Sequence, residues 1–140
     1  MNSNFITVQV EIDAPIAHVW DCFTQPEHII QWNFASPDWC CPSAENDLKV
    51  GGKMNWRMEA KDGSFGFDFW GTYTNIEDKK TVEITLGDER KMEVLFAEQY
   101  GKTTVAERFE AENTNPVEMQ KAGWQAILNN FKLHAEQKLG

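Results

Sequence analysis

The sequence predicts an α+β fold in which one curved antiparallel sheet packs against a long C-terminal helix. Three observations predict this fold class. Apolar and polar residues alternate near the N-terminus, several such segments separated by turn dipeptides follow residue 53, and apolar residues recur at helical spacing after Pro116. A sheet with one apolar face and a helix with one apolar stripe each have a surface to bury, and each covers the other.

Length and composition fit one globular domain over residues 1–140. The chain is 41% hydrophobic and contains six Trp and nine Phe, which is enough to build a core. Its net charge of −9 repels phosphate backbones and anionic membranes, so we expect no nucleic acid partner. No segment has the length of a transmembrane span, and the N-terminus lacks the basic and apolar regions of a signal peptide. We therefore expect no membrane insertion and a cytoplasmic location.

The first strand and two short helices are predicted before residue 33. Alternation over residues 5–13 gives a strand with one apolar face, formed by Ile6, Val8, Val10 and Ile12. Pro15 and Pro26 each suit the first turn of a helix, where the missing N–H has no partner to lose. Residues 33–52 carry two prolines and two glycines without sustained periodicity. They predict a long loop, and such loops are often lids or binding loops.

Five further antiparallel strands are predicted after residue 53, six in all, and the turns between them set the register. A two-residue turn at 62–63 brings apolar pairs together on one face and opposite charges together on the other. These pairs are Trp56 with Phe69, Met58 with Phe67, and Arg57 with Asp68. Turns at 78–79, 87–89 and 100–101 predict the remaining pairs: Tyr73 with Ile84, Glu77 with Lys80, Ile84 with Met92, Val82 with Val94, Phe96 with Val105, Val94 with Glu107, and Met92 with Phe109. Since a slip by one residue would turn a strand over, four hairpins that agree on one apolar face support this register.

The terminal helix is predicted to carry one broad apolar stripe, formed by Trp124, Ile127, Leu128, Phe131 and Ala135. We expect Trp124, Leu128 and Phe131 to be largely buried against the sheet. Gly123 lies inside this helix, where glycine costs about 1 kcal/mol relative to alanine. We expect it to permit close approach to the sheet or to leave room for a ligand.

A row of aromatic side chains is predicted to face this stripe. Phe65, Phe67 and Phe69 alternate along one strand and therefore point to the same side of the sheet, with Gly71 and Tyr73 continuing the row. A strongly curved sheet around a helix need not fill all the space between them. We therefore expect the row to be partly core and partly the wall of a pocket.

Several segments together carry a family resemblance that extends from Val8 to His134. They are "AP" and "VW" after the first strand, "QPEHIIQW", "DLKVGG" before the meander, and "GWQAILNNFKLH" in the terminal helix. The chain resembles the START-like, helix-grip superfamily, in the branch named after the activator of heat-shock protein 90 ATPase. The resemblance implies a curved sheet gripping the C-terminal helix around a cavity that often takes a small hydrophobic molecule. The superfamily includes lipid carriers, aromatic polyketide cyclases and hormone-binding proteins, so the fold leaves function open.

We expect the cavity to lie between the sheet and the C-terminal helix. The candidate lining residues are Trp32, Trp39, Trp56, Met58, Phe67, Phe69, Tyr73, Met92, Glu107, Phe109, Trp124, Leu128 and Phe131. On composition alone the aromatic members of this set are ordinary core, and the pocket interpretation draws on the resemblance. Trp32 and Trp39, at the ends of the predicted loop, are candidates for a gate.

Glu107 is the most informative polar residue, because the register points it inward between Val105 and Phe109. A buried carboxylate without a partner is costly, so this one must be paired, hydrated or protonated. One interpretation is a structural carboxylate at a wet cavity rim. The other is a polar anchor or general base for a ligand in an apolar pocket.

Other reactive residue types form no recognisable site in the sequence. His18, His28 and His134 have spacings that place no two on one helical face, so we expect no metal and no other cofactor. The three cysteines are expected to be reduced thiols, since adjacent Cys40 and Cys41 lack zinc-site spacing. No spacing indicates a catalytic Ser/His/Asp or Cys/His set, so no catalytic residue is assigned.

The sequence therefore predicts a small cytoplasmic protein that holds a hydrophobic small molecule, lipid-like or aromatic, as a monomer or homodimer. Two alternatives stay open. One is a protein-interaction module of the chaperone-activator type, with a place in the stress response. The other, an enzyme, is the less favoured: a cyclase- or hydrolase-like protein that works through Glu107.

Overall fold

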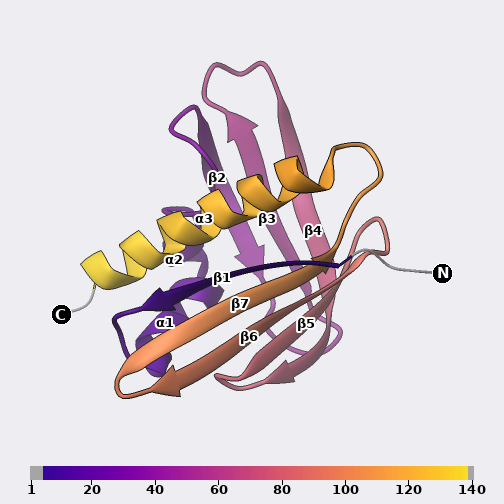
Figure 1. Ribbon diagram of the computed structural model, residues 1–140. Coiled ribbons are helices and arrows are strands. Elements are labelled where there is room, and N and C mark those ends of the chain that lie inside the picture. The colour runs from indigo at the N-terminus through magenta and orange to yellow at the C-terminus, as the bar shows by residue number, and fades with distance from the viewer. Residues whose placement is uncertain (1–4, 139–140) are drawn as a thin grey trace.

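The computed structural model describes residues 5–138 and shows a curled antiparallel sheet with a long helix running across one face (Figure 1). The strands are β1 (Phe5–Ile12), β2 (Trp39–Asn46), β3 (Lys53–Ala60), β4 (Gly66–Glu77), β5 (Thr81–Leu86), β6 (Lys91–Gln99) and β7 (Lys102–Glu110). The helices are α1 (Ile16–Thr24), α2 (Pro26–Ile29) and α3 (Val117–Gln137). The strand order β1-β7-β6-β5-β4-β3-β2 puts the first strand at one edge and β2 at the other. This is an α+β fold, consistent with a helix grip.

The sheet has seven strands, so the predicted six is corrected. The additional strand, β2, lies inside the segment 33–52 that the sequence predicts as a loop. It pairs only with β3, and its register shifts between Cys40 and Ser43 around Pro42. Proline cannot donate to a strand ladder and is tolerated at sheet edges and bulges, which explains both the irregular pairing and the missing sequence signal.

The predicted register is confirmed across the meander. Trp56 pairs with Phe69 and Arg57 with Asp68 in β3 and β4, and the predicted partners in β5, β6 and β7 also match. One pair is wrong: Glu77 lies opposite Thr81 and not Lys80. The β4–β5 turn is one residue longer than predicted, and a bulge between Tyr73 and Asn75 absorbs the difference, so Tyr73 still pairs with Ile84.

The core lies where α1, α2 and the C-terminal half of α3 pack on the sheet. Phe23 of α1 stacks on Trp32 with ring centroids 5.4 Å apart, and Phe131 of α3 meets both rings edge-on. Leu128 and Phe131 are fully buried, as predicted, whereas Trp124 is only half-buried. The apolar stripe of α3 is therefore core over its C-terminal half and only partly covered over its N-terminal half.

None of the helices within residues 5–138 combines the length and apolar character needed to cross a membrane.

Candidate functional site

A cavity of about 220 Å³ lies between the sheet and the N-terminal half of α3. Strands β3, β4, β6 and β7 supply one wall and α3 the other, and the segment after α2, the β5–β6 turn and the β7–α3 connection complete the lining. The lining residues are Trp32, Asn33, Trp56, Met58, Phe67, Phe69, Arg90, Met92, Glu107, Glu112, Gln120, Trp124 and Ile127.

The apolar wall follows from the period of the β-strand. Trp56 on β3 and Phe69 on β4 are cross-strand partners, so both side chains point to the same face. Trp124 reaches across from α3 and meets Phe69 edge-on at 5.7 Å. Its other side stacks on the buried Phe109, with ring centroids 3.8 Å apart. Trp124 is thus a rigid wall, held from behind by the core.

The phenylalanine row of β4 runs from this wall toward solvent. Phe69 is half-buried, Phe67 is 40% exposed and Phe65 is 60% exposed. Trp39 packs edge-on against Phe65 and Phe67, with centroid distances of 6.0 and 6.2 Å. Because Phe67 both lines the cavity and meets solvent, the cavity opens at this end.

Glu107 is the buried carboxyl group of the cavity. It lies on β7 between Val94 of β6 and Val8 of β1, and it is only 5% exposed. Burial raises the pKa of Glu107 to about 8, and no hydrogen bond or basic side chain among the described residues offsets this effect. At pH 7 the group is mainly a neutral carboxylic acid, able both to donate and to accept a hydrogen bond.

A second polar atom without a partner lies in the same wall. The indole Nε1 of Trp56 is buried and has no hydrogen-bond acceptor within residues 5–138. A buried polar group without a partner is uncommon in folded proteins and costs free energy.

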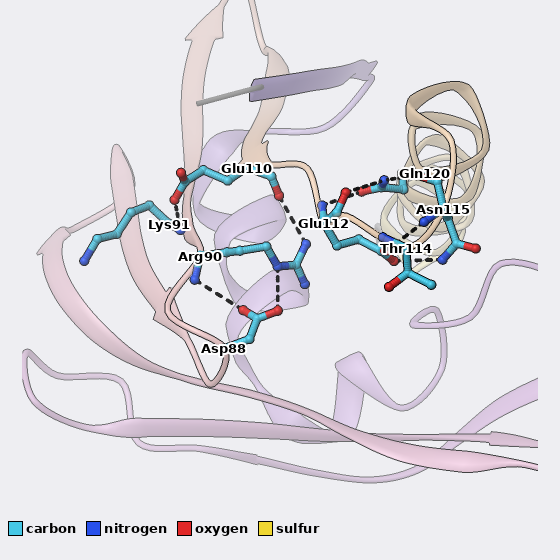
Figure 2. Close-up of polar contacts among 8 residues, drawn as sticks. All are labelled: Asp88, Arg90, Lys91, Glu110, Glu112, Thr114, Asn115 and Gln120. Atoms are coloured by element: carbon cyan, nitrogen blue, oxygen red, sulfur yellow. Dashed lines mark hydrogen bonds and ion pairs between the residues drawn. The ribbon is translucent and has the colours of Figure 1, made fainter. Parts of the chain in front are cut away.

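Arg90 lines the cavity and fixes the β5–β6 turn (Figure 2). Its Nε donates to Asp88 Oδ2 at 2.7 Å, and its Nη1 donates to the backbone carbonyl of Glu110 at 3.1 Å. The turn is thereby tied to the end of β7. The guanidinium group therefore meets the cavity with its main contacts already made.

Gln120, also in the lining of the cavity, fixes the connection through which the chain enters α3 (Figure 2). Its Oε1 accepts from the backbone N–H of Glu112 at 2.9 Å, and its Nε2 donates to the carbonyl of Asn115 at 2.7 Å. The Glu112 carboxylate accepts from the backbone N–H groups of Thr114 and Asn115. Its hydrogen bonds, first that from the Asn115 side chain, lower the pKa of Glu112, so it stays ionised at the rim.

The structure brings together most of the residues predicted for the cavity. Those that line it are Trp32, Trp56, Met58, Phe67, Phe69, Met92, Glu107 and Trp124. Those that do not are Trp39, Tyr73, Phe109, Leu128 and Phe131. Phe109, Leu128 and Phe131 are fully buried in the core, and the Tyr73 hydroxyl donates to Asn46 away from the cavity. That the lining residues bind a ligand stays a prediction.

Sequence reasoning missed the lining residues Asn33, Arg90, Glu112, Gln120 and Ile127. Two of them carried a signal: Ile127 belongs to the apolar stripe, and Gln120 lies four residues before Trp124, hence on the same helical face. Arg90 and Glu112 lie in a turn and a connection, where no periodicity reports which way a side chain points.

Two further expectations are corrected. Trp32 is no gate, because it is almost fully buried and its Nε1 donates to the Cys22 carbonyl at 2.9 Å. Gly123 is not needed for close approach to the sheet, because a Cβ placed there would meet nothing within 4 Å. The alternative, room for a ligand, gains no support, because Gly123 does not line the cavity.

A curled antiparallel sheet over a long C-terminal helix, with a cavity between the two, defines the START-like, helix-grip class. Within this class, the family described as "Activator of Hsp90 ATPase homolog 1-like protein" matches residues 13–136, and the chain belongs to this family.

Solved structures agree with this assignment. The AHSA1-like protein from Aeromonas hydrophila is 41% identical, with 94% of this chain and 93% of that chain covered and a TM-score of 0.86. A protein from Cytophaga hutchinsonii is 46% identical, with 94% and 92% covered and a TM-score of 0.82. A protein from Nitrosomonas europaea shares the fold at 17% identity, with 96% and 95% covered and a TM-score of 0.81. No curated protein matches the chain.

Proposed function

We propose that the protein binds a small, uncharged hydrophobic molecule in the cavity between the sheet and α3. One observation carries the proposal: a cavity with an aromatic wall contains a buried carboxyl group, Glu107, that has no partner among the described residues. Ligand sites are typically apolar concave surfaces with a few polar groups that fix orientation. A ligand that fills the cavity and meets the Glu107 carboxyl satisfies both features.

The size of the cavity favours a small ligand. Sites for drug-sized molecules typically span about 300–1,000 Å³, and this cavity has about 220 Å³. A bicyclic aromatic molecule or a short acyl chain fits this volume better than a complete lipid. The edge-on and stacked geometry around Trp124 also suits an aromatic ring.

The protonation state of Glu107 favours an uncharged ligand with one hydroxyl or carbonyl group. Below its pKa of about 8 the carboxyl can donate to a carbonyl or accept from a hydroxyl. Above this pKa the carboxylate only accepts and repels an anionic ligand. A neutral hydroxylated aromatic is therefore the preferred probe at pH 7.

Titration calorimetry with 2-naphthol tests the proposal, with the uncharged alcohol 1-octanol as the probe for a short acyl chain. We expect 2-naphthol to bind the wild-type protein and to bind at least about tenfold more weakly to Trp124→Ala, since the aromatic side chain that α3 contributes to the wall is lost. Trp70→Ala is the matched control, because Trp70 lies on the opposite face of β4 and is likewise partly exposed. If neither probe binds at millimolar concentration, the aromatic face has a core role only.

Glu107→Gln separates the polar anchor from the apolar wall. We expect this variant to keep binding naphthalene while its preference for 2-naphthol over naphthalene changes, because the amide no longer offers an acidic hydroxyl. An unchanged preference would remove Glu107 from the site and leave a purely apolar pocket.

Catalysis is a second candidate, favoured by the raised pKa of Glu107. A carboxyl group with a pKa of about 8 can give or take a proton at neutral pH, as a general acid or base must. Hydrolysis of 2-naphthyl acetate that Glu107→Gln abolishes would support an enzyme.

Chaperone interaction is a third candidate, favoured by the description of the matched family. A change in the ATPase rate of purified Hsp90 on addition of this protein, unaffected by Trp124→Ala, would support an interaction surface separate from the cavity. The cytoplasmic location and the oligomeric state stay predictions.

A further inference from the structure

The C-terminal part of α3 passes close to α1 and α2 (Figure 1), and a cluster of nitrogen and sulfur side chains lies among these three helices. It consists of Cys22 on α1, His28 on α2 and His134 on α3, and its donor atoms all lie within 4.8 Å of one another. His28 Nδ1 and His134 Nε2 are only 2.8 Å apart. Chain spacing could not indicate this cluster, because each residue comes from a different helix.

We propose that Cys22, His28 and His134 form a binding site for a divalent transition metal ion of the Zn²⁺ type. A thiolate and two imidazoles are donors that Zn²⁺ accepts readily, whereas Mg²⁺ and Ca²⁺ prefer oxygen ligands. The cluster offers three protein ligands, so the fourth tetrahedral position would hold water or another small ligand.

The two imidazole nitrogens need only a small adjustment to hold the ion, and the Cys22 sulfur, within 4.8 Å of them, has to come to roughly 3.6 Å. Two nitrogens bonded tetrahedrally to one Zn²⁺ lie about 3.3 Å apart, given bonds of about 2.0–2.1 Å. The present separation of 2.8 Å requires His28 and His134 to part by about half an ångström. Because His28 is half-buried on the short helix α2, its ring can shift and provide an entry path, while Cys22 and His134 are buried.

Binding of the metal ion requires two protons to move. The Cys22 thiol loses its proton to solvent as the sulfur–metal bond forms. The proton now shared between His28 and His134 moves to the outward-facing nitrogen of the ring that carries it. The site then holds one thiolate and two neutral imidazoles, the states in which these groups bind metal.

His18 supplies support from outside the site. Its Nε2 lies 2.8 Å from the carbonyl oxygen of Ala135 and 3.5 Å from Cys22 Sγ. A carbonyl can only accept, so Nε2 carries the hydrogen and donates it to Ala135, while the sulfur lies close to the same N–H. His18 thereby ties α1 to the C-terminal end of α3 beside Cys22, and such outer partners commonly hold metal ligands in place.

The metal site is separate from the cavity. His134 follows Trp124 by ten residues on α3, which places them about 15 Å apart along the helix axis. Neither Cys22 nor the two histidines line the cavity. Failure of one proposal therefore leaves the other standing.

Calorimetric titration of the reduced, chelator-treated protein with Zn²⁺ tests the site. We expect wild type to bind one Zn²⁺ with micromolar or tighter affinity, and Mg²⁺ in excess not to compete. Cys22→Ser and His28→Gln should each weaken binding by more than about tenfold. Cys40→Ser is the matched control, because Cys40 lies on β2 outside the cluster, and should leave the affinity unchanged.

Co²⁺ gives an independent readout of the sulfur ligand. We expect a thiolate-to-cobalt charge-transfer band in wild type and in Cys40→Ser that is absent in Cys22→Ser. If Cys22→Ser fails to fold by circular dichroism, His28→Gln decides the test, since His28 is only half-buried. Zn²⁺ affinity that stays within about twofold in His28→Gln, or a cobalt complex of wild type without a thiolate band, would overturn the proposal.

Discussion

Glu107 places a carboxyl group in the apolar interior, so its protonation state depends directly on its burial. An ionised Glu107 would lie between Val94 and Val8 with no compensating charge among the described residues. The fold therefore tolerates the group mainly in its neutral form. A residue with this cost is easier to understand as a contact for something that enters the cavity than as a contributor to stability.

The raised pKa of Glu107 makes stability depend on pH with a definite sign. The folded-state pKa is about 8 against an ordinary value of 4.5, so the folded state retains the proton more strongly. The resulting stabilisation is complete below pH 4.5 and is lost as pH rises through 8. Wild type should lose on the order of 3 kcal/mol of unfolding free energy relative to Glu107→Gln between pH 5 and pH 9. Urea unfolding of both proteins across this range measures the difference, and parallel curves would contradict the raised pKa.

At the scale of the element, α3 performs two tasks with one apolar stripe. Its C-terminal half supplies core residues, and its N-terminal half supplies the half-buried wall of the cavity. The same helical period serves both, so the sequence indicated the stripe without indicating where core ends and cavity begins. That boundary depends on the curvature of the sheet beneath the helix.

Phe131→Ala tests the core half of α3. The ring is fully buried and packs edge-on against Phe23 and Trp32, with centroids 5.4 and 4.8 Å away. We expect a loss of about 3–5 kcal/mol in unfolding free energy, from lost transfer energy and a residual cavity. Chemical denaturation measures it. A loss below about 1 kcal/mol would mean that the ring is poorly packed.

Gly123→Ala tests the cavity half of the same helix. An added Cβ meets no atom within 4 Å, and alanine is favoured over glycine in a helix interior by about 1 kcal/mol. We expect a gain of about 0.5–1 kcal/mol in unfolding free energy, measured by chemical denaturation, with 2-naphthol affinity unchanged. A destabilised variant would show that the helix packs closely against its neighbours at this position and has no room for a Cβ.

At the scale of the whole molecule, the sequence is most informative where consecutive turns and strands each follow a local rule. Successive hairpin turns define the register, and the register alone points Glu107 into the interior. The sequence does not predict the strand β2, because Pro42 and a register shift interrupt the alternation of apolar and polar residues. Only its pairing with β3 identifies it as a strand. The sequence does not predict the contact between His28 and His134 either, because it depends on how α2 and α3 pack and on no pattern within either helix.

Occupancy of the cavity should stabilise the whole fold, because its walls belong to both the sheet and α3. A ligand that binds only the folded state adds about 2.7 kcal/mol at one hundred times its dissociation constant. We therefore expect 2-naphthol at that concentration to raise the melting temperature of wild type by roughly 9 °C for a domain of this size. Differential scanning calorimetry measures the shift. Its dependence on ligand concentration should follow the affinity obtained by titration.

Phe69→Ala separates this effect from unspecific binding to exposed aromatic rings. Phe69 contacts Trp56 beside it in the sheet and Trp124 on the facing helix, so its removal should abolish most of the shift at the same ligand concentration. Phe5→Ala is the control, because Phe5 is partly exposed on β1 and packs against Arg108 away from the cavity. Equal shifts in the two variants would place the ligand on the surface. A shift lost only in Phe69→Ala would locate it between the sheet and α3, where binding couples the two elements that the fold holds together.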